Sequence, residues 1–217
     1  MKRIFISAAI IAMISGFSVQ AYADLELRGE GSSFYGSHRL IYDTDRDITW
    51  YDYTQYYPEW GGMMSWAAGL EVNSGGVNYT DWRLPSALNQ DGSGPCNGAD
   101  CTGSEMGHLF YTELGNVAES DEAGWDYQLK NAGPFQDLQS AYVWSDTEHS
   151  KDYSWHFDTF FGFQSPHGKN GKAYFGALAV RPGDVAVAVA PEPVSAILFG
   201  VGGVVLAVRR KLARWCK

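Results

Sequence analysis

Four segments of the chain show the spacing of apolar and polar residues that predicts β-strands. They are 34–42, 141–145, 153–164 and 174–181. Within the third segment, alternate positions are occupied by large or β-branched residues with mostly more polar neighbours: Trp155, Phe157, Thr159 and Phe161. Such alternation is typical of a strand with one buried face. Many turn residues interrupt the pattern, since the chain contains 25 glycines.

Two further segments have the periodicity of a helix. In 62–72, apolar residues recur at the spacing of one helix face: Met63, Trp66, Ala67 and Leu70. In 103–114, the T-x-x-E spacing of Thr102 and Glu105 predicts a capping box at the helix start. Gly115 then predicts the end of this helix.

Two long segments, 89–100 and 116–133, follow neither periodicity. The first is rich in Asn, Asp, Gly, Ser and Pro, which predicts a surface loop. Few strands, two helices and long loops together predict an α+β fold. The stretch between the two hydrophobic ends of the chain, 24–190, has a length that suits one domain.

The first 23 residues have the layout of a secretory signal peptide. Lys2 and Arg3 form a basic start, residues 4–17 are mostly apolar, and Ala21-Tyr22-Ala23 is a small-x-small cleavage site. We therefore expect export and cleavage by signal peptidase.

The last 27 residues predict a membrane segment. Pro191-Glu192-Pro193 precedes an uncharged, mostly apolar run, 194–208, and Arg209, Arg210 and Lys211 follow it. A helix over this run would rise roughly 22 Å, against a hydrocarbon core of about 30 Å, so the flanking residues decide the interpretation. Basic residues beside a span favour the cytoplasmic side. We therefore expect a single transmembrane helix over 194–208, with the preceding domain on the far side of the membrane.

The two ends together resemble the PEP-CTERM sorting system of Gram-negative bacteria. The resemblance rests on a sorting motif and a basic tail: Pro191, Glu192, Pro193, Arg209 and Arg210. It implies export, transient holding in the inner membrane and processing by an exosortase. The final location would be the periplasm, the cell surface or the extracellular matrix. A plain anchor without processing is the alternative.

The stretch between the two ends is strongly acidic. Residues 24–190 hold nine Lys and Arg against 24 Asp and Glu, a formal charge of −15. Such a surface repels nucleic acid and anionic lipid, and it tolerates cations, neutral glycans and basic partners. Nucleic acid is therefore excluded as a partner.

Two cysteines, Cys96 and Cys101, lie within or beside the polar loop 89–100. In an oxidising compartment we expect them to form a disulfide. Zinc is the alternative, but it needs more ligands at regular spacing, and 24–190 contain no third cysteine.

Five blocks stand out along the acidic stretch: Leu40-Ile41-Tyr42-Asp43 with Asp47-Ile48-Thr49-Trp50, Asp81-Trp82-Arg83-Leu84-Pro85, Glu105-Met106-Gly107-His108-Leu109, Tyr142-Val143-Trp144-Ser145-Asp146-Thr147-Glu148, and Ala179-Val180-Arg181-Pro182-Gly183-Asp184. In this order and spacing they resemble the Lcl C-terminal domain family, a C-type-lectin-like group. The resemblance implies a domain over 24–185 with short antiparallel strands, two helices and long loops, followed by a linker and sorting tail over 186–217. It also implies a surface module that binds polysaccharide. It defines no catalytic set, so no catalytic residue is predicted.

Aromatic residues crowd into the segment 50–66: Trp50, Tyr51, Tyr53, Tyr56, Tyr57, Trp60 and Trp66. Flat rings stack on the apolar faces of sugars, and Tyr and Trp add a polar group. We expect Trp50 and Trp66 to pack in the core. The candidate ligand-binding residues are therefore Tyr53, Tyr56, Tyr57 and Trp60. Because adjacent strand residues point to opposite faces, Tyr56 and Tyr57 cannot both be buried on one face.

Arg83 is a further candidate, for recognition of an anionic sugar. In so acidic a domain we favour a structural ion pair with a carboxylate for this side chain.

Asp43, Asp45 and Asp47 form a D-x-D-x-D run, which opens many calcium loops. Ile48 stands where an EF-hand requires Gly, and Thr54 stands where it requires the bidentate Glu. We therefore favour an acidic turn between two strands, with calcium as the alternative, and we expect no other cofactor.

These observations predict an exported, non-catalytic module that binds extracellular polysaccharide or matrix. One alternative is a structural matrix protein without a specific ligand. The other is a secreted glycan hydrolase, because 24 acidic residues make chance pairs of carboxylates frequent.

Overall fold

The computed structural model describes residues 25–57, 59–118, 129–171 and 175–185 of the 217-residue chain. Its elements in chain order are β1 (Leu25–Ser33), β2 (Gly36–Asp43), β3 (Ile48–Tyr56), α1 (Trp60–Ala68), β4 (Val72–Ser74), β5 (Val77–Tyr79), α2 (Glu105–Gly107), η1 (His108–Glu113), β6 (Tyr142–Glu148), β7 (Tyr153–Asp158), β8 (Phe163–Gly168) and β9 (Phe175–Pro182). The segment η1 is a π-helix that continues α2 directly.

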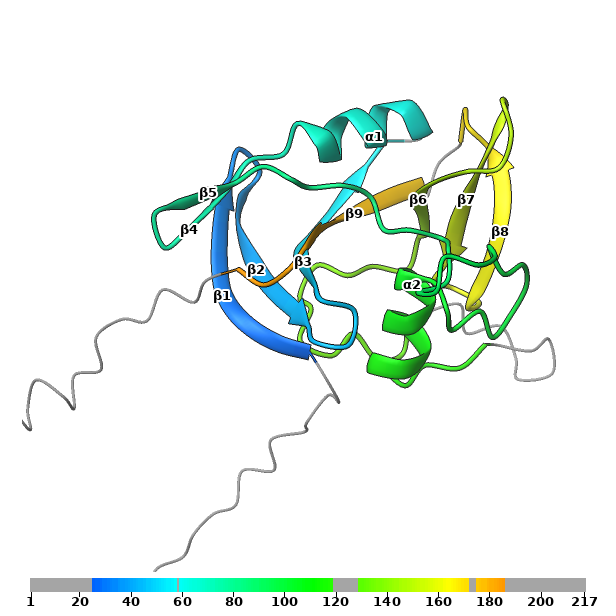
Figure 1. Cartoon of the computed structure of the whole chain (residues 1–217), viewed down its shortest axis with the longest axis horizontal. Coiled ribbons are helices and arrows are strands. Elements are labelled where there is room, and N and C mark those ends of the chain that lie inside the picture. Colours follow the sequence, from blue (N-terminus) through cyan, green and yellow to red (C-terminus); the bar gives the residue numbers. More distant parts are fainter. Residues whose placement is uncertain (1–24, 58, 119–128, 172–174, 186–217) are drawn as a thin grey trace, which may run out of the picture.

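Nine strands form one sheet in the described part of the chain, in the order β5-β4-β1-β2-β3-β9-β6-β7-β8. Neighbouring strands are antiparallel except β6 and β9, where Tyr142 and Val143 pair in parallel with Phe175 and Gly176. In Figure 1, α1 lies on one side of β3 and β9, and α2 lies on the other. The central strands are therefore covered on both faces.

Consecutive residues on the central strands enter separate cores, because side chains alternate between the two faces of a sheet. On β9, Leu178 joins the core on the α2 side, whereas Ala177 and Ala179 pack on the α1 side. On β7, every residue after Tyr153 is buried. The prediction of one half-buried strand over 153–164 is therefore wrong: β7 is buried on both faces, and a turn separates it from β8.

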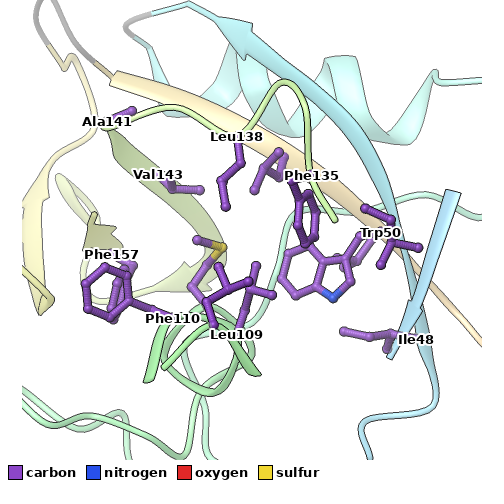
Figure 2. Close-up of a cluster of buried hydrophobic side chains, with 14 residues drawn as sticks. Ile48, Trp50, Leu109, Phe110, Phe135, Leu138, Ala141, Val143 and Phe157 are labelled. Carbon is purple, nitrogen blue, oxygen red and sulfur yellow. The ribbon is translucent and has the colours of Figure 1, made fainter. Parts of the chain in front are cut away.

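The larger core lies on the α2 side of the sheet, and it contains 14 buried residues. Figure 2 shows Leu109 and Phe110 of η1 pointing toward the sheet, with Phe157 beside them. Trp50 and Phe135 meet edge to face, with ring centroids 6.3 Å apart. Burying one such ring contributes about 1.5–3 kcal/mol, so this cluster is a principal source of stability.

The helix predicted over 62–72 is present as α1, which ends at Ala68. Met63 and Ala67 are buried, as the periodicity predicts. Leu70 is also buried, although it lies beyond the helix end at Gly69.

The helix predicted over 103–114 is present as α2 and η1 together. Its N-cap is Ser104, whose Oγ accepts the N–H of Gly107 at 3.0 Å, so the predicted capping box at Thr102 is wrong. Gly115 has a φ of 63°, which is favourable for glycine and typical of a helix end.

The loop between β5 and α2 contains a disulfide between Cys96 and Cys101, with the two Cα atoms 5.6 Å apart. The predicted disulfide is therefore confirmed. Gly98 and Gln164 exchange both backbone hydrogen bonds, at 2.8 and 2.9 Å, so the loop is attached to β8.

The prediction of an α+β domain followed by a transmembrane helix is wrong. The described chain is largely β, with nine strands in a mixed sheet and two short α-helices. No helix among the described residues is long and apolar enough to cross a membrane. The predicted span over 194–208, the signal peptide over 1–23 and the sorting motif lie outside the described residues. Nothing in the described structure therefore supports a membrane segment or either targeting signal.

Candidate functional site

An open pocket of about 500 Å³ lies where the β1–β2 turn, the end of α1 and the β4–β5 hairpin meet. Aromatic and polar side chains share its lining: Phe34, Tyr35, Trp66, Ser65, Glu71 and Asn78. Its volume falls within the roughly 300–1,000 Å³ of small-ligand pockets. The mixture of flat rings with hydroxyl, amide and carboxylate groups makes this pocket the candidate functional site.

Phe34 and Tyr35 form the two-residue turn between β1 and β2. Gly36, which follows, has a φ of 115°, a backbone conformation that other residues rarely adopt. Ser33 Oγ accepts the N–H of Tyr35 at 2.9 Å and lies 2.8 Å from the hydroxyl of Tyr51. The turn is thus fixed by hydrogen bonds, while the Phe34 ring is 96% exposed.

The rings behind the pocket form a packed layer. Tyr35 stacks on Tyr53, with centroids 5.2 Å apart and an angle of 28° between the ring planes. Trp66 lies with its ring centroid 6.3 Å from each of these two tyrosines. The His38 ring packs against another side of Tyr53, with ring centroids 4.8 Å apart. Because neighbouring rings restrict Tyr35 and Trp66, a ligand would find them already oriented, which reduces the entropic cost of binding.

Of the predicted site residues on β3 or directly after it, only Tyr53 lies next to this pocket. Tyr53 is half-buried behind the lining and supports it through Tyr35. Tyr56 and Tyr57 are 53% and 47% exposed, but neither belongs to the pocket lining. Tyr57 packs closely on Gly62, where a Cβ atom would come within 2.3 Å of the tyrosine ring. These two exposed tyrosines therefore lie outside the pocket.

Trp60 lies in a different environment, against β6 and the loop after β8. Its Nε1–H donates to the carbonyl of Ser145 at 2.7 Å, and the Lys169 ammonium lies 4.6 Å from its ring centroid. This tryptophan thus joins parts of the scaffold and is not part of the pocket lining.

Arg83 belongs to a structural ion pair, as its acidic surroundings favour. Its two Nη atoms donate to both carboxylate oxygens of Glu105, at 2.7 and 2.6 Å. Glu105 also accepts the N–H of Ser86 at 2.7 Å, and Asp146 lies 3.9 Å from the guanidinium. Burial raises the pKa of the Asp146 carboxyl. With Glu105 bound in bidentate fashion, Arg83 is engaged by the scaffold and not directed into the pocket.

None of the pocket-lining residues was predicted from the sequence, including its three aromatic residues, Phe34, Tyr35 and Trp66. The first two fall inside the segment predicted as a strand, and Trp66 falls on the apolar face of α1, where core packing is the ordinary expectation. One signal in the sequence was available. Two adjacent aromatic residues stand between serines and Gly36, and such small and polar neighbours are typical of a turn that exposes its side chains.

The acidic run 43–47 forms the turn between β2 and β3, as predicted, but its three carboxylates do not gather into one group among the described residues. Asp47 has a φ of 50° and accepts the hydroxyl of Tyr42 at 2.8 Å. Asp45 is exposed. Asp43 is fully buried, and burial raises its pKa to about 6. Asp43 lies beside His108 and Glu113 of η1, and Asp45 Oδ2 lies 3.8 Å from His108 Nε2.

Comparison with known proteins adds no further information: no family model, no curated protein and no solved structure matches this chain.

Proposed function

We propose that this domain is a non-catalytic binding module for a neutral polysaccharide outside the cytoplasm. The observation that carries the proposal is the pocket in which exposed and half-buried rings stand next to polar side chains. Sugar rings offer apolar C–H faces and a rim of hydroxyl groups, so a ligand of this class would use both kinds of lining.

The exposure of Phe34 favours a ligand that covers this ring. A phenylalanine that is 96% exposed at a hydrogen-bonded turn contributes little to the packing of the domain. Covering one face of such a ring gains on the order of 1 kcal/mol, which corresponds to roughly a fivefold change in affinity. The ring is thus better explained by binding than by folding.

Charge favours a neutral ligand over an anionic one. Glu71 is the charged residue in the pocket lining, and it lies in a domain of net charge −15 over residues 24–190. A carboxylate accepts hydrogen bonds from sugar hydroxyl groups and repels sulfate or uronate groups. The disulfide between Cys96 and Cys101 is consistent with an oxidising compartment outside the cytoplasm.

Affinity electrophoresis of the purified full chain tests the proposal, in gels that contain either neutral glucans, mannans and galactans or a sulfated galactan. We expect retardation by at least one neutral polymer and none by the sulfated one. Phe34→Ala should weaken the retained interaction about fivefold, whereas Tyr56→Ala, a matched change at an exposed ring outside the pocket, should leave it unchanged. Loss of binding in both variants, or in neither, would refute the assignment to this pocket. No retardation by any polymer would favour a structural matrix protein without a specific ligand.

A further inference from the structure

A second group of polar side chains lies on the α2 side of the sheet, where the β2–β3 turn meets the helical segment. Figure 1 shows this turn beside α2. Arg46 Nη2 in the turn donates to the carbonyl of Thr102 at 3.2 Å, and Asp45 Oδ2 lies 3.8 Å from Nε2 of His108. One potential ligand atom from each of Asp43, His108 and Glu113 lies within 4.8 Å of the other two.

The π-helix is what places His108 and Glu113 on the same side of their segment. In an α-helix, residues three and four apart are neighbours, and residues five apart diverge. In η1 the backbone hydrogen bonds run between residues five apart, as from the N–H of Leu114 to the carbonyl of Leu109 at 2.9 Å. His108 Nε2 and Glu113 Oε1 accordingly lie 3.0 Å apart.

The Asp43 carboxylate provides an independent observation. This residue is 0% exposed, and its Oδ2 is buried without a hydrogen-bond partner among the described residues. Its other oxygen, Oδ1, accepts the N–H of Arg46 at 3.0 Å. A buried carboxylate oxygen without a partner is costly, and a bound cation is a ligand that would satisfy it.

Arg46 lies close to this group, yet it does not fill that role. Its side chain contacts the Thr102 carbonyl, and its Nε is itself buried without a partner among the described residues. Four described carboxylates, those of Asp43, Asp45, Glu105 and Glu113, act on this one guanidinium. The patch therefore holds more negative than positive groups within the described part of the chain.

We propose that Asp43, His108 and Glu113 bind a divalent transition-metal ion, with zinc as the ion of the right ligand chemistry. One imidazole and two carboxylates suit zinc, whereas calcium takes oxygen ligands throughout. Two ligands of a tetrahedral zinc lie roughly 3.3–3.5 Å apart, since each is about 2.0–2.1 Å from the ion. The distance of 3.0 Å between His108 and Glu113 is close to this value. The exposed Asp45 carboxylate, 3.8 Å from His108 Nε2, adds negative charge beside the site. The ion would link the β2–β3 turn to the π-helix.

The test is calorimetric titration of the full, metal-free chain, produced without a histidine tag, with ZnCl₂ and separately with CaCl₂. We expect one equivalent of zinc to bind and calcium to bind more weakly. Excess zinc should raise the melting temperature by about 5 °C. Asp43→Asn and Glu113→Gln should each weaken zinc binding at least tenfold. Asp47→Asn removes the same charge from the same acidic run, and it should change zinc binding less than twofold.

Absence of zinc binding by the wild-type chain would overturn the proposal, and so would unchanged binding by the Asp43→Asn variant. Calcium binding that depends on Asp47 would indicate a calcium site formed by the acidic run 43–47. That result would also overturn the zinc proposal. Crystals of the wild-type protein soaked in ZnCl₂ provide a measurement that does not depend on the folding of any variant. Anomalous scattering between Asp43, His108 and Glu113 is the expected result, and a soaked crystal without it would refute the site.

Discussion

The closed cluster on the α2 side of the sheet and the pocket on the α1 side use aromatic side chains in different ways. On the α2 side, Trp50, Phe110 and Phe157 belong to a closed cluster and are almost completely buried. On the α1 side, Tyr35 and Trp66 pack only partly against the core, and a ring beside them is left to the solvent. The difference shows that crowding of aromatic residues along a sequence does not locate a binding site. Trp50 and Phe157 on strands are part of the core, whereas Phe34 at a turn next to the sheet is on the surface.

The largest expected effect belongs to the closed cluster. Phe157→Ala should lower the free energy of unfolding by about 3–5 kcal/mol, because the truncation removes a buried ring and leaves a cavity that the sheet and η1 cannot close. The ring contacts Phe110 and Tyr111, at centroid distances of 5.4 and 6.2 Å. Urea denaturation of the variant and the wild type measures the difference. A loss below about 1 kcal/mol would mean that the cluster tolerates a cavity, and that the contrast between the cluster and the pocket is weaker than their burial indicates.

The neighbouring residue on β7, His156, faces the other side and gives the second prediction. It packs among Trp144, His167 and Phe175, and its Nδ1 is buried without a hydrogen-bond partner among the described residues. Burial, with a smaller contribution from the charge of His167, lowers the pKa of His156 to about 4. The folded state therefore binds fewer protons at this side chain than the unfolded state does between roughly pH 4 and 6.5.

The sign of the pH effect follows from this difference in bound protons. The contribution of His156 to stability should be unaffected above about pH 6.5 and should fall as the pH decreases toward 4, by on the order of 3 kcal/mol in total. In His156→Gln this loss is absent, so the stability of the variant relative to the wild type should increase as the pH is lowered. Burial raises the pKa of Asp158 to about 6, so the contribution of this residue to stability increases as the pH falls. This contribution is the same in the wild type and in the variant. Urea denaturation of both proteins from pH 7 to pH 4 isolates the histidine, and parallel pH curves would contradict its role.

Local patterns in the sequence predicted those features that depend on neighbouring residues. The helix around Met63 and Ala67 was found, and so was the disulfide between Cys96 and Cys101. The polar loop that carries the disulfide also lies at the surface, as its composition predicts. In each case the signal is contained in a short stretch of the chain, and the surrounding fold reinforces it.

The predicted fold class was wrong because central strands of this sheet are buried on both faces. In β3, the segment Ile48–Tyr56, five consecutive residues from Ile48 to Asp52 are buried, so the apolar–polar alternation that marks a strand is missing. Its aromatic residues instead indicated a ligand site. The short strands β4 and β5 contain only three residues each, which is too few for a periodicity to be recognised.

The candidate site depended on contacts that no local pattern contains. Trp66 has the spacing of a core residue on α1, yet it lines the pocket because the β1–β2 turn stands next to the end of this helix. Likewise, Asp43 meets His108 and Glu113 only because a π-helix forms where the sequence predicts an ordinary helix. Partners so far apart in sequence are brought together by the tertiary fold, and their spacing along the chain carries no sign of it.

The smallest expected effect on stability belongs to the exposed ring at the β1–β2 turn. Phe34→Ala removes a side chain that is 96% exposed, and the turn remains held by the hydrogen bond from the Tyr35 N–H to Ser33 Oγ. The free energy of unfolding should therefore change by less than about 0.5 kcal/mol, against several kcal/mol for Phe157→Ala. Urea denaturation of the two variants under the same conditions makes the comparison direct. A loss above about 1 kcal/mol would show that Phe34 packs in the folded state, and its ring would then be part of the scaffold and not a surface kept for a ligand.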